Sequence, residues 1–494
     1  MSELSVLTLL VFSPLLGAVI TYLISNNERT VKITAIMLSL IPLALSLGIF
    51  VGYNNGQSGF QFMEQKEWIS TLGISYALGV DGLSIPLIFL TALLTTLVLI
   101  FSWDIGHKAK QYYTLILLLE TGVLGVFVAL DFFLFYLFWE VVLIPMYFMI
   151  VEWGGPRRKY AAVKFIIYTH VGSLVMLLGI IWMAVVAAGE LNGFTFSMLE
   201  ISQVEFAREL QLLIFPILLF GFAVKLPVVP LHTWLPDAHV EAPTAGSVLL
   251  AGILLKLGGY GLVRIAISML PEGAHAYALL MAVMGVISMV YGAIMALAQD
   301  DLKKMVAYSS ISHMGFVLLG LASMNINGVN GAIYQMFAHG LITAVLFMVC
   351  GIIHHNVRTR NISELGGLAN VLPKLSVVYI TAAFASLGLP GLAGFIAEFL
   401  VFIGAFATFK VLTIIGLFSV VITAAYYLRS IQKVFLGPYR QELGDHLHDL
   451  QNFQTVPLVI LLILILLFGI YPTPVLNLIN INALELLSVL GGAR

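Results

Sequence analysis

Residues 221–264, GFAVKLPVVPLHTWLPDAHVEAPTAGSVLLAGILLKLGGYGLVR, place two lysines inside sequence that is otherwise almost wholly apolar. A charged side chain near the centre of a bilayer costs about 2.5 kcal/mol or more, so intramembrane lysines usually face a polar cavity and mark an ion or proton path. Lys225 is followed by Pro227 and Pro230, whose missing amide donors predict a helix break beside the charge. A broken helix at membrane depth is tolerated where it lines a wet cavity, as in transporters.

The alternative is that both ammonium groups reach the membrane interface along extended side chains. Lys256 argues against this alternative, because it lies about 16 residues into an apolar segment that starts near Val240. The next charge, Arg264, is about two helical turns farther on. We therefore expect both lysines to be functional.

The composition identifies the class of protein. Of the 494 residues, 60% are hydrophobic and only 10% are charged, which excludes a soluble globular protein and predicts one that is buried in lipid. The single cysteine, Cys350, excludes a disulfide and any iron–sulfur cluster that this chain would carry alone. The N-terminal segment lacks the basic region of a cleavable signal, so its first apolar run predicts a retained membrane span.

The apolar runs are long enough to cross a hydrocarbon core of roughly 30 Å and predict an all-α polytopic membrane protein of about fourteen transmembrane helices. The polar excursion at residues 53–81, rich in Gly and Asn, predicts a surface hairpin, and no second soluble domain is visible. The expected spans are residues 4–24, 31–52, 82–102, 112–130, 132–151, 161–188, 210–229, 241–263, 275–298, 303–323, 329–353, 376–403, 411–436 and 456–478.

The basic residues predict the orientation, since Lys and Arg collect in cytoplasmic loops. Sixteen of them lie in connections on the side opposite to the N-terminus, and five lie on the N-terminal side: Lys66, Arg208, Arg264, Lys410 and Arg494. Both termini are therefore expected outside the cytoplasm, as an even number of spans requires.

The charged positions also predict an internal repeat. Expected helices four to eight carry Glu140 in the second helix, a broken fourth helix with Lys225, and Lys256 in the fifth. Expected helices nine to thirteen carry His313 in the second helix and a fourth helix broken at residues 389–394, with Glu398 about 12 Å beyond Pro390. Because five is an odd number, the second unit enters from the opposite face. The prediction is two inverted five-helix repeats, with discontinuous helices 7 and 12. The units are residues 1–111, 112–264, 265–436 and 437–494.

The intramembrane carboxylates are the next candidates. Glu140 is the only charge between Asp131 and Glu152, so it must be protonated or paired, and we expect Lys225 to be its buried partner. Glu120 is also within a span, where a contact with a neighbouring subunit and a role as a proximal relay are equally good explanations.

The histidines within spans, His339 and His313, could relay protons near neutral pH, although buried histidines are often structural. We interpret His170 and the loop residues His232 and His239 as structural. His354 with His355, and residues 445–449 (DHLHD), superficially resemble metal ligands, but they lie at membrane edges without a third cluster, and no metal is expected. No nucleotide-binding or nucleic-acid-binding pattern is present.

Five segments carry a resemblance to a known family: FWEVVLIPMYFMI (138–150), AVKLPVVPLHTWLPDAHVEAPTAGSVLLAGILLKLGGYG (223–261), DLKKMVAYSSISHMGFVLLG (301–320), QMFAHGLITAVLFMVCG (335–351) and LPGLAGFIAEF (389–399). They closely resemble the proton-pumping antiporter-like membrane subunits of respiratory complex I and its relatives. The resemblance implies half-channels joined by a central line of charges. It assigns Glu140 as the key glutamate, Lys225 as the broken-helix lysine, Lys256 as the bridging lysine and Glu398 as the exit group, with His339 and His313 along the axis.

The glutamate at position 398 resembles the M-type subunit, since L-type and N-type subunits usually have a lysine there. The chain also lacks the long lateral helix of the L type. The resemblance implies a proton-translocating subunit without a redox centre, in the plasma membrane of a prokaryote. It implies L-type and N-type partners, flavin and iron–sulfur clusters in partner subunits, and a quinone as acceptor. The electron donor stays open among NADH, ferredoxin and reduced deazaflavin.

Two other functions stay open. One is a subunit of a multisubunit cation/proton antiporter or of a membrane-bound hydrogenase. The other is a membrane scaffold in which buried charges only fix the helix register. The glutamate at position 398 and the absence of an obvious cluster of sodium-coordinating oxygens favour the redox-driven proton translocator.

Overall fold

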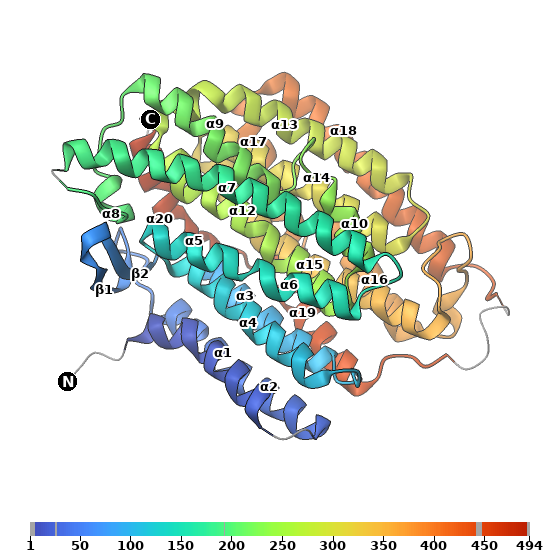
Figure 1. Ribbon diagram of the computed structural model, residues 1–494. Helices are drawn as coiled ribbons and strands as arrows, with labels where there is room; N and C mark the ends of the chain where they lie inside the picture. Colours follow the sequence, from blue (N-terminus) through green and yellow to red (C-terminus); the bar gives the residue numbers. More distant parts are fainter. Residues whose placement is uncertain (1–4, 25–26, 192, 441–446, 492–494) are drawn as a thin grey trace.

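The computed structural model describes residues 5–24, 27–191, 193–440 and 447–491, so the sequence positions Asp445, His446 and Arg494 lie outside the described residues. Long helices run roughly parallel to one another as a single bundle, and a small two-stranded sheet lies at one end of it (Figure 1). Eleven of the expected spans are long and apolar enough to cross a membrane. The prediction of an all-α polytopic membrane protein is confirmed.

The helices that match the expected spans agree with them within a few residues at most ends. In chain order they are α1 (Val6–Leu23), α2 (Glu28–Gly52), α3 (Ile85–Phe101), α4 (Ala109–Val128), α5 (Phe132–Val141) with α6 (Leu143–Trp153), α7 (Arg158–Glu190), α9 (Arg208–Lys225) with α10 (Trp234–Glu241), the continuous run α11 (Thr244–Leu249), η2 (Leu250–Leu254), α12 (Leu255–Gly261) and η3 (Leu262–Ile267), α13 (Pro271–Leu297), α14 (Leu302–Ala322), α15 (Ile326–Val357), α16 (Pro373–Ser386) with α17 (Ala393–Thr408), α18 (Lys410–Ser430) with η5 (Ile431–Phe435), and α19 (Asn452–Ile470). Short helices α8 (Met198–Ile201), η1 (Ser70–Leu72) and η4 (Leu368–Asn370) lie in connections.

The predicted hairpin at residues 53–81 is present. Strands β1 (Gln61–Ile69) and β2 (Ile74–Val80) pair antiparallel, and Gly73, at φ 61°, ends the turn between them. The Glu64 carboxylate accepts the backbone N–H of Leu7 at 2.8 Å, so the hairpin lies against the first turn of α1. It therefore marks the N-terminal face of the bundle.

The expected last span, residues 456–478, is wrong at its C-terminal end. Helix α19 ends at Ile470, just before Pro472, and a further helix, α20 (Thr473–Val489), follows. Along α20, Asn480 bonds Asn330 near the start of α15, and Glu485 accepts the N–H of Gly59 beside the hairpin. Helix α20 thus lies along the hairpin end of the bundle, where Figure 1 draws it beside α8 and β2.

Both predicted helix breaks are confirmed. The first separates α9 from α10 after Lys225, and the second separates α16 from α17 between Leu387 and Leu392. Gly388 and Gly391 in the second break have φ angles of 79° and 91°, which favour glycine. The division into inverted repeats at residues 112–264 and 265–436 stays a prediction.

Helices α13 and α14 approach closely because glycines face each other. A Cβ atom on Gly315 would lie 2.6 Å from the carbonyl oxygen of Gly285 and 2.7 Å from the nitrogen of Met289. These are backbone atoms of a neighbouring helix, which cannot move aside as the end of a side chain can. Small residues at such positions are a usual route to helix packing in membranes.

We predict that Gly315→Ala lowers the stability of the assembled subunit, by about 1–3 kcal/mol as overpacking does. Gly48→Ala is the matched control, since a Cβ there meets nothing within 4 Å and alanine favours a helix. Heat-induced aggregation of this subunit within the purified complex measures the effect. Equal aggregation temperatures for Gly315→Ala and Gly48→Ala would contradict the packing argument.

Candidate functional site

Lys256 lies at the centre of the bundle and is fully buried. It belongs to α12, a short α-helical piece between two π-helical pieces, η2 and η3, and such irregular turns are frequent at functional sites. Its Nζ donates to the carbonyl oxygen of Ala251 in the preceding turn and lies 2.8 Å from Nδ1 of His339 on α15. The structure thus brings together the central lysine and one of the two predicted histidines.

His313 on α14 continues this line, with its ring centroid 5.4 Å from that of His339. Nε2 of His313 lies 3.1 Å from the Ser386 hydroxyl, and Nδ1 lies 3.2 Å from the Gln335 amide nitrogen. The same Nδ1 is 3.5 Å from a carboxylate oxygen of Glu398. The two histidines and Glu398 line one small cavity, so Lys256, His339, His313 and Glu398 lie in that order along one polar line. Among the described residues, Nε2 of His339 has no hydrogen-bond partner, so the two histidines meet through a ring contact.

Glu398 occupies this position because the second helix break makes room for it. Its carboxylate packs against Gly388, where a Cβ atom would lie 2.6 Å from Oε2. The prediction that Glu398 lies about 12 Å beyond the break is therefore wrong for the position of its carboxylate group. Since α16 and α17 do not form one straight helix, Glu398 folds back against the broken segment and is 6% exposed.

Lys225 ends α9 and is 1% exposed. Its Nζ has no hydrogen-bond partner among the described residues and lies 5.3 Å from the centre of the Trp139 ring, within the range of a cation–π contact. The carbonyls that the break frees are partly satisfied, since Val224 accepts the indole N–H of Trp234 at 3.0 Å and Ala223 accepts the N–H of Val228 at 3.2 Å.

Glu140 has different partners from the one predicted. Its Oε2 lies 2.9 Å from Nδ1 of His170, and its Oε1 accepts the Ser173 hydroxyl, both on α7. No hydrogen bond or ion pair joins it to Lys225, although it remains within electrostatic range of that lysine. The expected direct pair is thus replaced by a Glu140–His170 contact. The sequence signal for it was the i, i+3 spacing of His170 and Ser173 in an apolar run.

Glu120 on α4 is 1% exposed, and neither of its carboxylate oxygens has a hydrogen-bond partner among the described groups. None of the hydrogen bonds or ion pairs of the central line reaches it. The structure therefore leaves Glu120 buried and apart from the other candidates.

His239 is a buried helical histidine, whereas its sequence context predicts a structural loop residue. It belongs to α10, is completely buried, and stacks on Phe347 at 4.6 Å. Neither ring nitrogen has a hydrogen-bond partner in the described part of the structure, and the ring lies within the electrostatic fields of Lys256 and Lys303. The sequence did not reveal this position, because no helix is expected between the spans at residues 210–229 and 241–263.

The geometry suits proton transfer along a chain. Imidazoles can accept a proton on one nitrogen and donate from the other, and a lysine and a carboxylate exchange protons with them over hydrogen-bond distances. Among the described residues, no group of three metal-ligating side chains gathers anywhere. The site therefore offers proton donors and acceptors.

Residues 129–423 match the family model described as NADH:quinone oxidoreductase/Mrp antiporter, TM. The chain belongs to this family. It is 43% identical over 495 residues to F(420)H(2) dehydrogenase subunit M of Methanosarcina mazei, with 99% of each chain covered. It is 36% identical over 494 residues to NADH-quinone oxidoreductase subunit M of Rickettsia bellii, again with 99% of each covered.

A chain in the structure of respiratory complex I from Thermus thermophilus with bound NADH has the same fold, with a TM-score of 0.88 and 29% identity. The match covers 97% of this chain and 99% of that chain. The predicted resemblance to M-type antiporter-like subunits is confirmed. The chain is a membrane-embedded subunit of a multisubunit respiratory complex.

We predict that His170→Leu reduces proton delivery by about tenfold, because a charge-assisted hydrogen bond to a carboxylate contributes about 1.5–3 kcal/mol. His170→Gln, which still offers a donor, should retain most of the activity. Proton uptake per electron by the intact complex in proteoliposomes measures both variants. His275→Leu is the control, since within the described part of the chain the one hydrogen bond of His275 is to the Leu490 carbonyl, at the end of the bundle. Wild-type uptake by His170→Leu would make the Glu140–His170 contact purely structural.

Proposed function

We propose that this subunit translocates protons across the membrane, driven by electron transfer to a quinone in partner subunits. The observation that carries the proposal is the buried line Lys256–His339–His313–Glu398. This line runs from α12 to the helix break between α16 and α17. Charged and titratable groups inside a membrane are costly and are retained where they serve a path.

The order of the groups supports a direction of transfer. While Glu140 is anionic it favours the charged form of Lys225, and a proton on Glu140 removes that attraction. Lys225 can then give up its proton towards Lys256. From Lys256 the proton passes through His339 and His313 to Glu398, whose carboxylate is close to the exposed backbone of the second break.

The exposure of Glu140 supports the proposed partners. Its side chain is 24% exposed and that of His170 is 50% exposed, on helices that cross the membrane. A carboxylate left facing lipid is strongly unfavourable, so another protein covers this face in the assembled complex. L-type and N-type antiporter-like subunits fit this role.

The remaining parts of the proposal follow from the same family. Flavin and iron–sulfur clusters reside in partner subunits, and a quinone accepts the electrons. The complex lies in the plasma membrane of a prokaryote, with both termini of this chain outside the cytoplasm, in agreement with the bias of basic loops. The start of α1 and the end of α20 both contact the hairpin region, so they share one face.

A cation/proton antiporter is the second candidate, since the family model includes Mrp antiporters. The glutamate at position 398 weighs against this candidate, because such antiporter proteins usually resemble the L-type and N-type subunits in having a lysine there. The electron donor, whether NADH, ferredoxin or a reduced deazaflavin, depends on the partner subunits.

We predict that Glu398→Ala lowers the protons released per electron and slows turnover by about tenfold or more, which corresponds to a barrier higher by roughly 1.4 kcal/mol. Glu398→Lys should keep part of the activity, because an ammonium can also relay protons. The measurement uses the intact complex in proteoliposomes, with the exposed loop carboxylate variant Glu205→Ala as control. An unchanged ratio and turnover in Glu398→Ala would show that the exit group is another residue, with His339 the first to test.

A further inference from the structure

A cavity of about 420 Å³ lies under the hairpin, outside the line of proton carriers. Its walls come from the hairpin segment, α8, η3 and α20, and they include the exposed residues Ser202, Gln203 and Val489. The cavity is therefore open at the N-terminal face of the bundle. Its volume, with Asp81, Arg264 and Asn482 among the lining residues, suits several water molecules.

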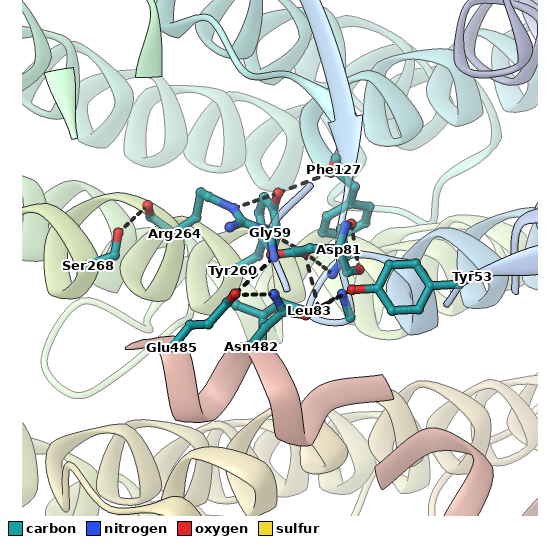
Figure 2. Close-up of polar contacts among 12 residues, drawn as sticks. Tyr53, Gly59, Asp81, Leu83, Phe127, Tyr260, Arg264, Ser268, Asn482 and Glu485 are labelled. Atoms are coloured by element: carbon teal, nitrogen blue, oxygen red, sulfur yellow. Dashed lines mark hydrogen bonds and ion pairs between the residues drawn. The ribbon is translucent and has the colours of Figure 1, made fainter. Parts of the chain in front are cut away.

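The inner end of this cavity is a buried ion pair. Nη2 of Arg264 lies 2.6 Å from Oδ1 of Asp81, and the two side chains are 11% and 3% exposed. Nε of Arg264 donates to the Tyr260 hydroxyl at 3.1 Å, and that hydroxyl donates to the Phe127 carbonyl at 3.0 Å. The guanidinium also lies over the Phe60 ring at 4.8 Å. Figure 2 shows the contacts of Arg264 with Tyr260 and Asp81.

A network of hydrogen bonds holds the Asp81 side of the pair in place. Asp81 accepts the N–H groups of Leu83 and Ser84 before α3, and the neighbouring Gly82 donates to Asn482 at 2.8 Å. Tyr53 also donates to Asn482, as Figure 2 shows. Burial, and secondly the nearby Asp81, raise the pKa of Tyr53 to about 12, so its hydroxyl remains a donor.

Arg264 also lies in line with the central lysine. Lys256, Tyr260 and Arg264 are spaced by four residues along one helix, which puts Arg264 about 12 Å beyond Lys256 towards the hairpin face. Every residue from Lys256 to Val263 is buried. The ion pair thus lies between the open cavity and the buried segment that contains Lys256.

We propose that the Arg264 guanidinium, held by Asp81 and Tyr260, is an electrostatic seal that keeps protons of the outer phase from returning to Lys256. The proposal rests on the proposed function, since a seal matters only where Lys256 carries protons. It adds a residue that prevents the back-leak of protons and does not itself relay them.

The choice of residue supports a barrier. A guanidinium stays charged at all accessible pH values, so it cannot pass a proton on, and a fixed cation in a narrow polar passage repels cations. A buried ion pair is seldom more stabilising than apolar packing, so stability alone does not account for it. The Asp81 carboxylate cancels much of the guanidinium field at Lys256, about 12 Å away, so the barrier acts mainly on a proton that approaches the guanidinium itself.

The test measures passive proton leak in proteoliposomes that contain the intact complex, with an imposed pH step and no electron donor. Asp81→Asn keeps the cation and should be as tight as the wild type. Arg264→Met with Asp81→Asn removes both charges and leaves no unpaired carboxylate, and it should leak about tenfold faster. The double variant Arg264→Gln with Asp81→Asn keeps hydrogen-bonding groups at both positions and is measured alongside. The test can then be made if the complex assembles with either of the two double variants.

Adding Lys256→Met to the leaking variant should return the passive proton leak to the wild-type rate, because protons that enter from the cavity then have no lysine to accept them. Three results would overturn the seal: tight vesicles for the neutral double variants, an equal leak for Asp81→Asn alone, or a leak that survives Lys256→Met. A leak from Asp81→Asn alone would show that the pair only pins the hairpin. The proposed function is judged separately, by whether Lys256→Met changes the protons moved per electron during turnover.

Discussion

The buried contact between Lys256 and His339 is the interaction on which the rest of the structure depends. An ammonium group in an apolar interior is stable only if nearby groups accept its hydrogen bonds, and Lys256 finds the Ala251 carbonyl and His339. The carbonyl is free to accept because the helix is π-helical at residues 250–254. A local irregularity of one helix therefore makes the central position available to a titratable group.

The two broken helices place further titratable groups in the interior of the bundle. On one side the break after Lys225 lets the lysine end a helix in the interior, beside Trp139. On the other side the break between α16 and α17 lets Glu398 approach Gly388 and His313. Both breaks place polar backbone at membrane depth, which is tolerated where it is buried in protein or lines a water-filled cavity, and residues 389–391 of the second break are exposed. The hairpin and α20 lie at the end of the bundle beyond Arg264 and are joined there by hydrogen bonds.

The sequence predicted the parts of this arrangement that follow from strong local signals. Pro227 and Pro230 indicated the first break, the LPGLAG segment indicated the second, and isolated charges in apolar runs indicated most members of the line. The sequence did not reveal which groups touch. Glu140 contacts His170 because α5–α6 and α7 pack side by side, and the partner of a carboxylate depends on such packing. Helix α20 was not predicted, because the apolar character of the sequence continues past Pro472 and the expected span therefore runs on to residue 478.

A double-variant comparison tests most directly the claim that Lys256 and Glu398 belong to one continuous proton route. Protons released per electron are measured for the intact complex with Lys256→Met, with Glu398→Gln and with both. Groups that act in series are non-additive, so the double variant should match the lower of the two single variants. If the two reductions multiply in the double variant, the groups act independently and the single buried route is contradicted.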